Sequence, residues 1–368
     1  MKKGLVVAEF PSPYRISVFE KLSQEYKLDI FFEKANDQER SDDYTVKSSS
    51  IKFYILNNNS DKKVFGKYCM HIKKYDFILC YNACILPGVI AMICGIIAKV
   101  PCFTNLDGAF INKNLLKDIL KTYMFSHAAL CFSSGNMATK YYLHYKARIE
   151  NIRVHNFTSL TSKDIMNKPI SEEDKRNIRK NMGLKEDDTY VISVGQFIKR
   201  KGYDLLLSAW KQLNSKENVH LILIGGGSEQ HNYLEMINKY NIQNVELYEF
   251  MPKEKIFNYY KASDIFVLPT REDIWGLVVN EAMACGLPIV TTNMCVAGLE
   301  MISNENGAIY TFDNIDELTM ILNKYIDNRE LRSNQGKENI CKIQGNIMEN
   351  IALSHIDNIN RYFVTSGM

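Results

Sequence analysis

The chain has 368 residues, more than a single hydrophobic core usually serves, so two domains are expected. Its hydrophobic content of 46%, with 24% charged residues, is typical of a soluble globular protein. The net charge of +3 hides an asymmetry, because residues 1–165 hold 23 Lys/Arg against 15 Asp/Glu and residues 166–368 hold 22 against 27. The basic part either meets an anionic membrane surface or carries ordinary solvated lysines, and no nucleic-acid partner is expected.

The cysteines, the histidines and the amino terminus exclude several classes of protein. No pair of the nine cysteines has C-x-x-C spacing and most lie in apolar runs, so we expect buried thiols in a reducing compartment. The seven histidines lack paired metal-ligand spacing, so no tightly bound metal is expected. The apolar run that follows Lys3 is too short for a signal peptide, which predicts a cytoplasmic protein, peripheral at the inner membrane face if the basic part binds lipid.

The longest apolar stretch runs from Ile85 to Ala98 and is interrupted by Pro87, Gly88 and Gly95. Its 14 residues fall short of the roughly 20 that a membrane-spanning helix needs. We therefore expect a buried core helix here.

Short β-branched or aromatic runs alternate with amphipathic helical stretches in the first part of the chain. This alternation predicts a Rossmann-like α/β domain over residues 1–165, with a parallel sheet covered by helices on both faces. The expected strands are residues 4–8, 28–32, 52–56, 77–81, 101–105 and 129–133. The expected helices are residues 16–25, 87–99, 115–126 and 136–145.

The pattern weakens between Asn151 and Pro169, which places the domain boundary near residue 165. A second Rossmann-like domain is predicted over residues 166–345, and a helical segment over 346–368 that could return to the first domain. The expected strands are 190–194, 220–224, 245–248, 265–269 and 288–292. The expected helices are 172–181, 203–213, 229–240, 253–261, 276–285 and 316–328, with helix again from Gln335 onward. Two such domains leave a cleft between facing sheets, and ligands bind beyond the carboxyl ends of the strands.

The strongest motif is PTREDIWGLVVNEAMACGLP, from Pro269 to Pro288. It predicts a strand end, a loop with Asp273 and Trp275, and a helix that Gly276 and Leu277 open. The free N–H groups of that helix start favour an anion such as a diphosphate. Either acid of the motif, Asp273 or Glu281, could alone serve only to stabilise the helix dipole; together they predict a binding site.

The second motif, VGQFIKRKGY, follows the strand that ends at Gly195 and delivers Gln196, Arg200 and Lys201 in one loop. Arg offers a planar fork and Lys a compact charge for phosphate oxygens, although such residues are often merely solvated. Their place at a strand end favours diphosphate binding.

A third motif, LILIGGGSE, runs a buried strand into Gly225 and Gly226. It is not G-x-G-x-x-G, so it predicts close backbone approach to a nucleotide or tight packing rather than dinucleotide binding. The next strand ends near Phe250 and Met251, whose backbone could contact a base.

In the first half, two segments follow predicted strands on the cleft side: PSPYR, with Tyr14 and Arg15, and NLDG, with Asp107. Arg15 could hold an anionic acceptor, and Asp107 could act on its hydroxyl as a general base or by hydrogen bonding. An Asp-Gly pair is also a common turn, so a purely structural role for Asp107 stays open.

Over residues 190–300 these motifs resemble the retaining glycosyltransferases of family 4, which have the GT-B fold. Their hallmark, Glu, seven residues, Glu and Ala-Met-Ala-x-Gly-x-Pro, stands here from Asp273 through Glu281 to Pro288, with Asp in the first place. The family's Gly-Arg loop start corresponds to Gly195-Gln196, and Leu106 or Asp107 stands where many members carry His. The PSPYR segment looks like the amino-terminal part of transferases from bacterial capsule and O-antigen clusters.

The resemblance implies a nucleotide-sugar donor, a UDP-sugar first and a GDP-sugar next, and a glycan or lipid-linked glycan acceptor in cell-surface polysaccharide biosynthesis. In this family the first acid contacts donor-sugar hydroxyls and the second the ribose, roles that fall on Asp273 and Glu281. Arg200, Lys201 and the helix start at Gly276 would stabilise the leaving diphosphate without a metal, with retention of configuration.

Other functions remain open from the sequence. A nucleotide-sugar epimerase or phosphorylase could use the same fold, whereas a nicotinamide-dependent dehydrogenase lacks its glycine fingerprint. A non-catalytic GT-B partner protein is suggested by Asp273, Gln196 and Leu106, which depart from the family pattern.

Overall fold

A computed structural model describes residues 1–35, 50–111, 114–213 and 217–367 of the chain. It divides the chain into two compact units, one of Met1–Thr158 with Asn346–Met368 and one of Ser159–Gly345. Strands and helices alternate in both, as the sequence pattern predicts, and each sheet is parallel throughout. The α/β class predicted from the sequence is therefore confirmed.

The first unit contains a seven-stranded sheet in the order β3-β2-β1-β4-β5-β6-β7. Its strands are β1 (Lys3–Ala8), β2 (Lys27–Phe32), β3 (Phe53–Ile55), β4 (Phe77–Tyr81), β5 (Cys102–Leu106), β6 (Leu130–Ser133) and β7 (Ile152–Val154). Alternate residues of the central strands enter two different cores; Val6 faces one and Val7 the other. A strand buried on both faces reads as a continuous apolar run, which is why these strands were recognisable in the sequence.

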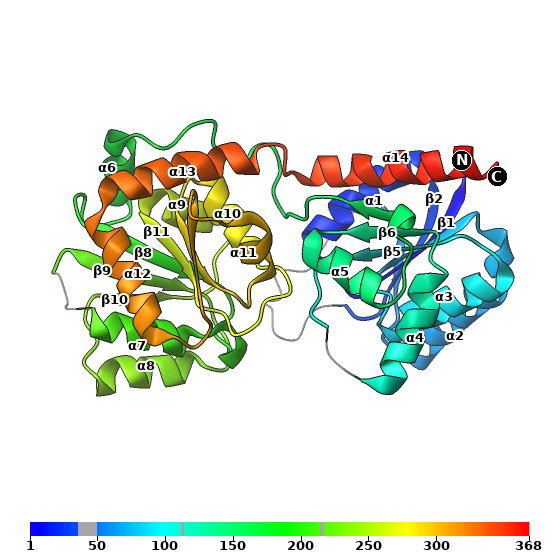
Figure 1. Cartoon of the computed structure of the whole chain (residues 1–368), viewed down its shortest axis with the longest axis horizontal. Coiled ribbons are helices and arrows are strands. Elements are labelled where there is room, and N and C mark those ends of the chain that lie inside the picture. Colours follow the sequence, from blue (N-terminus) through cyan, green and yellow to red (C-terminus); the bar gives the residue numbers. More distant parts are fainter. Residues whose placement is uncertain (36–49, 112–113, 214–216, 368) are drawn as a thin grey trace. The chain divides into compact units, whose positions relative to one another are not determined.

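Helices cover both faces of this sheet (Figure 1). The helices are α1 (Pro13–Glu25), α2 (Asn59–Met70), α3 (Leu86–Ala98), α4 (Leu115–Ser126), α5 (Asn136–His144) and α14 (Met348–Ser366), with short 3₁₀ turns at Ile72–Lys74 and Ile149–Asn151. One face carries α1 and α14, whose Phe19 and Phe363 join the same core. The other face carries α2, α3, α4 and α5, anchored by residues such as Phe65, Met92 and Phe125.

The second unit contains a six-stranded sheet in the order β10-β9-β8-β11-β12-β13. Its strands are β8 (Thr189–Val194), β9 (Val219–Ile224), β10 (Val245–Tyr248), β11 (Ile265–Leu268), β12 (Ile289–Thr292) and β13 (Gly307–Tyr310). Its helices are α6 (Glu172–Asn181), α7 (Tyr203–Gln212), α8 (Gln230–Lys239), α9 (Lys253–Ala262), α10 (Leu277–Ala284), α11 (Val296–Met301), α12 (Ile315–Asp327) and α13 (Arg329–Ile343), with a 3₁₀ turn at Lys199–Lys201. Residues of α7, α8 and α12 share one core with the sheet.

The division between the units falls after Thr158, earlier in the chain than the sequence places the boundary. Residues that follow Thr158 are bound within the second unit: Asp164 pairs with Lys253 at 2.7 Å, and the Ser159 hydroxyl lies 3.4 Å from Glu281. These partners are distant in the sequence, so no local pattern reveals them.

Four elements carry weak local signals and were not predicted. Three lysines and a glycine dilute the apolar pattern of α2, and β7 has only three residues. Likewise, α11 and β13 are short and each includes a glycine.

Two sequence expectations are wrong. The stretch expected to be a buried core helix is α3, which lies on the surface with Leu86, Ile90 and Ile97 exposed. The expectation of buried thiols fails for Cys84 and Cys341, which are exposed, although the nine cysteines are all free. Among the described residues, no helix is long and apolar enough to cross a membrane.

Candidate functional site

The loops that follow β8, β9, β10 and β11 all leave the same edge of the second sheet, because its strands are parallel. These loops, together with helix α10, contain the residues that the sequence predicts for donor binding. They come from the carboxyl ends of neighbouring strands, where open α/β sheets hold their ligands.

Glycines let these loops touch through their backbones. A Cβ atom on Gly225 would lie 1.9 Å from the carbonyl oxygen of Gly195, and one on Gly202 would lie 2.1 Å from that of Pro269. Gly202 also has φ +72°, a left-handed conformation that favours glycine. Of the two alternatives left open for the glycines after β9, the structure shows tight packing between loops at Gly225, and backbone approach to a nucleotide stays a prediction.

The loop after β10 closes over the loop after β9. The ring of Phe250, itself partly exposed, would lie 3.1 Å from a Cβ atom on Gly226. Met251 and Gln196 are also partly exposed at this edge of the sheet.

An ion pair joins the two strongest motifs. The ammonium of Lys201, after β8, contacts the carboxylate of Asp273, after β11, and both side chains are largely buried. Asp273 is also fixed through its backbone, since its N–H donates to Met294 O at 2.9 Å and its carbonyl accepts from Val296 N at 3.1 Å. These partners follow β12, a strand whose loop the sequence did not single out.

Arg200 also joins the loops after β8 and β11. Its guanidinium donates to the carbonyl of Glu272 at 2.8 Å, and its own carbonyl accepts from the N–H of Arg271 at 2.8 Å. Arg271, in turn, forms a two-pronged pair with Asp204 at 2.7 and 2.6 Å. This support by Arg271 and Asp204 was not predicted, because nothing local in the sequence links them.

Helix α10 begins at this site. Gly276 is its N-cap, with φ +96°, and no side chain of the described residues caps the helix start. The indole N–H of Trp275 donates to Asn280 at 2.9 Å, so this ring is held inside the unit rather than offered to a ligand. An uncapped helix start beside Lys201 is suited to bind an anion.

Glu281 lies farther along α10 and is partly exposed. Its carboxylate accepts from the hydroxyl groups of Tyr260 at 3.2 Å and Ser159 at 3.4 Å. Burial raises the pKa of Glu281 to about 7, although nearby Lys253 acts in the opposite direction. A carboxyl group with this pKa can donate as well as accept hydrogen bonds near neutral pH.

The first unit holds a second cluster, at the carboxyl edge of its own sheet. Buried Arg15 pairs with Asp107 at 2.8 Å, and the hydroxyl of Tyr14 lies 3.5 Å from the same carboxylate. The predicted acceptor residues Tyr14, Arg15 and Asp107 are thus brought together.

Behind Asp107 lies a buried network that the sequence did not reveal. The amide of Asn105 donates to Asp107 at 2.9 Å, and its oxygen lies 2.9 Å from His155 Nε2 and 3.2 Å from His355 Nε2. Burial lowers the pKa of His155 to about 4 and that of His355 to about 3, so both rings are neutral near pH 7. His355 belongs to α14, 250 residues after Asn105.

Several buried polar atoms of this unit have no hydrogen-bond partner among the described residues. They include Nε and Nη1 of Arg15 and the hydroxyl oxygens of Ser12 and Ser134. These three residues follow β1 and β6, so they belong to the edge of the sheet that also carries Asp107. Buried donors without partners are costly unless a ligand or water satisfies them.

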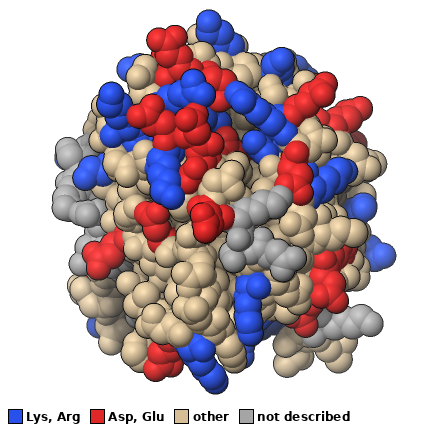
Figure 2. Space-filling model, turned by 90° about the vertical axis from the view of Figure 1, so that its left-hand side faces the viewer, with Lys and Arg blue, Asp and Glu red and all other residues tan. Residues whose placement is uncertain are grey.

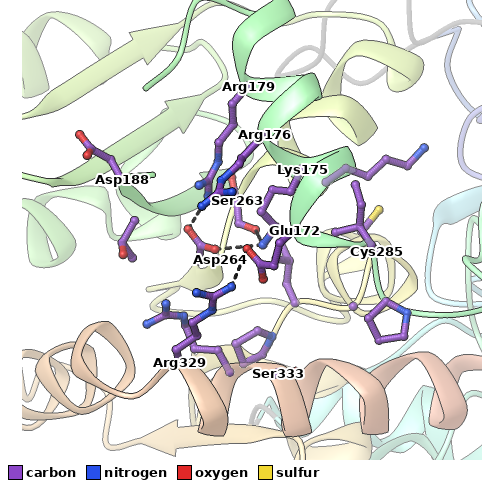
Figure 3. A pocket seen from close by; sticks show the side chains of 18 of the residues that line it. Glu172, Lys175, Arg176, Arg179, Asp188, Ser263, Asp264, Cys285, Arg329 and Ser333 are labelled. Atoms are coloured by element: carbon purple, nitrogen blue, oxygen red, sulfur yellow. Dashed lines mark hydrogen bonds and ion pairs between the residues drawn. The ribbon is translucent and has the colours of Figure 1, made fainter. Parts of the chain in front are cut away.

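A pocket of about 290 Å³ in the second unit lies away from the candidate site. Residues that precede β8, β11 and β12 line it, which places it at the amino edge of the sheet. Figure 3 shows Asp264 between Arg179 and Lys175, and Glu172 beside Arg329. Because these charges already have partners, the pocket is better explained as a structural ion network.

In the part of the chain that the structure describes, no three His, Cys, Asp or Glu side chains gather in a group that could hold a metal ion. Positive charge at the candidate site is provided by Lys201 and Arg200, beside the start of α10.

Comparison with known proteins identifies the second unit. A model of the family described as "Glycosyl transferases group 1" matches residues 174–340, the segment that contains both motifs joined by the Lys201–Asp273 pair. The chain is a GT-B glycosyltransferase. This agrees with the resemblance that the two motifs suggest.

Two bacterial relatives align with most of this glycosyltransferase. "O-antigen biosynthesis glycosyltransferase WclY" of Escherichia coli is 24% identical over 296 residues, covering 77% of this chain and 76% of the relative. "Protein CapJ" of Staphylococcus aureus is 24% identical over 326 residues, covering 83% and 79%.

Among solved structures, Anabaena HepE in complex with UDP matches this glycosyltransferase with a TM-score of 0.78. It is 16% identical, and the match covers 98% of this chain and 100% of HepE. At this identity the likeness establishes the fold, in agreement with the GT-B fold predicted from the sequence.

Proposed function

We propose that this glycosyltransferase moves a sugar, with retention of configuration, from a nucleotide-sugar donor to a glycan or lipid-linked glycan acceptor in cell-surface polysaccharide biosynthesis. A UDP-sugar is the first candidate donor and a GDP-sugar the next. The relative named for O-antigen biosynthesis supports the pathway, and the UDP bound by HepE supports the donor class. The resemblance to family 4 supports the stereochemistry.

The observation that carries the proposal is the ion pair of Lys201 and Asp273 beside the uncapped start of α10. Breaking the anomeric bond builds negative charge on the leaving diphosphate. Lys201, Arg200 and the N–H groups that begin at Gly276 are arranged to stabilise that charge before the reaction starts. Preorganised donors of this kind act without a metal ion.

Asp273 and Glu281 have different parts in this proposal. Asp273, fixed by backbone bonds on both sides, would accept hydrogen bonds from the donor-sugar hydroxyls. Glu281, with its raised pKa, would exchange hydrogen bonds with the ribose hydroxyls. Phe250, Met251, Gln196 and the loop glycines would surround the nucleotide.

On the acceptor side, Arg15 has two donors without a partner in the described part of the chain, which supports an acceptor that carries an anionic group. Asp107 accepts from Arg15 and would orient or deprotonate the attacking hydroxyl. Contact with the membrane is proposed as peripheral, because the acceptor would be lipid-linked.

Lys201→Ala tests this site against its exposed neighbour Lys199→Ala. We expect the first substitution to lower turnover of a UDP-sugar about 100-fold or more, because it removes a donor to the leaving group. The second should change turnover less than about twofold, since Lys199 is exposed and single surface substitutions have small effects. If Lys201→Ala lowers the melting temperature and its folded fraction turns over normally, unfolding explains the lost turnover. That result would contradict the assignment.

A further inference from the structure

The outer face of α3 is apolar although it faces solvent. Leu86 is 69% exposed, Ile97 is 72% exposed, and Ile90, between them on the same face, is also exposed. The inner face of α3 packs closely on the sheet, where a Cβ atom on Gly95 would lie 2.2 Å from Ile78. The exposed residues are therefore not required to attach the helix to its own core.

Helix α4 repeats this feature beside α3. Leu115 and Leu116 are 78% and 80% exposed, and Ile119 and Tyr123 follow at helical spacing on the exposed side. Only Met124 and Phe125 of this helix are buried. Because α3 and α4 contact each other, their exposed residues form one feature, the α3–α4 surface: Leu86, Ile90, Ile97, Leu115, Leu116, Ile119 and Tyr123.

Single exposed hydrophobic residues are ordinary, but stripes on two adjacent helices indicate an interaction surface. The charges around it are mostly positive: α2, α3 and α4 carry five lysines and two aspartates. Lys62, Lys63, Lys67 and Lys117 are exposed. The carboxylate of Asp118 accepts from Tyr145 at 2.8 Å and from the N–H of Asn114 at 3.0 Å, so it is already engaged.

The opposite layer of the same unit differs in charge. Helices α1 and α14 carry Glu20, Glu25, Glu349 and Asp357 against Arg15, Lys21 and Arg361, and Arg15 is buried in its pair with Asp107. Figure 1 shows α2, α3 and α4 on the side of the sheet away from α1 and α14. The apolar residues and the excess of lysine thus share one side of this unit.

The surface also begins beside the candidate acceptor residues. Leu86 and Leu115 are the first residues of α3 and α4, which follow β4 and β5 and so start at the carboxyl edge of the sheet. Asp107 lies at that edge, directly after β5, with Arg15 paired to it.

We propose that the α3–α4 surface docks the first unit on an anionic lipid bilayer. Apolar side chains at the helix starts would enter the boundary between headgroups and acyl chains, and the neighbouring lysines would contact anionic headgroups. A second copy of the chain is a poorer occupant, because a symmetric contact would bring the same lysine-rich surfaces together.

The docking would hold Arg15 and Asp107 near the membrane, where a lipid-linked acceptor is found. Only this consequence rests on the proposed function; the surface and its charge do not depend on the reaction. With 13 residues, α3 is too short to span a bilayer, so the contact would be interfacial.

Flotation of the full chain with lipid vesicles tests the proposal. We expect binding to vesicles that contain phosphatidylglycerol, little binding to pure phosphatidylcholine, and release as the salt concentration rises. The double variant Leu116→Ser and Ile119→Ser should bind about tenfold more weakly. The matched control, Leu353→Ser with Val364→Ser, replaces exposed residues of α14 on the opposite layer and should bind like the parent chain.

The result that would overturn the proposal is equal binding by both double variants, or loss of binding by both. The surface would instead be a contact between copies if the parent chain does not bind vesicles and the Leu116/Ile119 double variant changes the oligomeric state in light scattering. UDP-dependent stabilisation, measured on the same samples, reports on the donor site of the second unit. Its retention by a variant that has lost vesicle binding separates this proposal from the proposed function.

Discussion

At the scale of single residues, Glu281 combines a partly buried carboxyl group with two neutral hydroxyl donors, Tyr260 and Ser159. Burial is the main cause that raises its pKa to about 7. In the unfolded chain a glutamate has a pKa near 4.3, so the folded chain keeps a proton that the unfolded chain has lost between these two values. Stability must therefore fall as the pH rises through this window.

We predict that the free energy of unfolding falls by about 1–3 kcal/mol between pH 4.5 and pH 7 through this group. Glu281→Gln removes this titrating group, so the stability of the variant relative to the parent chain should rise over the same pH range. Urea unfolding of both proteins at several pH values measures the difference. Parallel pH profiles would show that folding does not raise the pKa of Glu281.

In the first unit, Arg15 is the residue whose substitution tests the acceptor site. It is buried, pairs with Asp107, and its Nε and Nη1 donors find no partner among the residues that the structure describes. Arg15→Lys keeps the charge but loses the planar fork, so the KM for the acceptor should rise about tenfold or more while the KM for the donor stays unchanged. Initial rates with each substrate varied in turn give both constants. Lys21→Gln, exposed on the same helix, is the control, and an equal rise in both KM values would contradict the acceptor role.

At the scale of elements, α6 is attached to the second sheet by a buried ion network at the amino edge, opposite the candidate donor site. Asp264 pairs with Arg179 at 2.6 Å and with Lys175 at 2.9 Å, and accepts from the backbone N–H of Tyr190 at 2.8 Å. Burial alone would raise the pKa of Asp264, but the two cations and this N–H lower it below its usual value. This stabilisation is present above the usual aspartate pKa and is lost as the pH falls through the folded-state value.

Asp264→Asn should lower the free energy of unfolding by about 3 kcal/mol at pH 7, because it leaves two buried cations without a carboxylate. Asp187→Asn is the matched control in the same pocket. Its pair with Arg176 is exposed on both sides, and such pairs contribute about 0–1 kcal/mol. Denaturant titration measures the loss in free energy of unfolding for each variant. Similar losses for the two variants would show that solvent screens the buried network.

Figure 2 shows the charges on one face of the molecule. Lysine and arginine side chains are interspersed with aspartate and glutamate on this face, and neither sign forms a separate charged patch. Exposed charges of opposite sign also pair in the second unit, as Arg176 and Asp187 do at 2.8 Å.

The elements also show why the sequence predicts some features and not others. Strands buried on both faces, such as β4, and the loop motifs around Asp273 and Lys201 are local patterns, and the sequence predicts them. The pairing of Lys201 with Asp273 spans 72 positions, and that of His355 with Asn105 spans 250. Such contacts depend on strand order, which the sequence pattern does not specify.

The prediction that α3 is a buried core helix is wrong for a different physical reason. Hydrophobicity on every side of a helix usually means burial on every side. Here only the face with Gly95 and Met92 meets the sheet, while Leu86 and Ile97 remain outside. Composition alone does not distinguish a helix that is buried on all sides from one whose second apolar face is exposed to solvent.

At the scale of the whole molecule, the chain consists of two parallel-sheet units, and α14 returns the end of the chain to the first. The candidate donor residues, from Gly195 to Glu281, all lie in the second unit. The candidate acceptor residues Tyr14, Arg15 and Asp107 all lie in the first. Donor binding can therefore be measured on the full chain without any acceptor.

The most direct test of the central claim is a thermal-shift measurement of the full chain with UDP, GDP and their common sugars. A ligand at 100 times its Kd stabilises by about 2.7 kcal/mol, which raises the melting temperature by several degrees. We predict such a rise with UDP and its sugars, a smaller rise or none with GDP, and loss of the UDP effect in Glu281→Ala. No rise with any nucleotide, or an unchanged UDP effect in Glu281→Ala, would contradict a nucleotide-sugar site at the carboxyl edge of the second sheet.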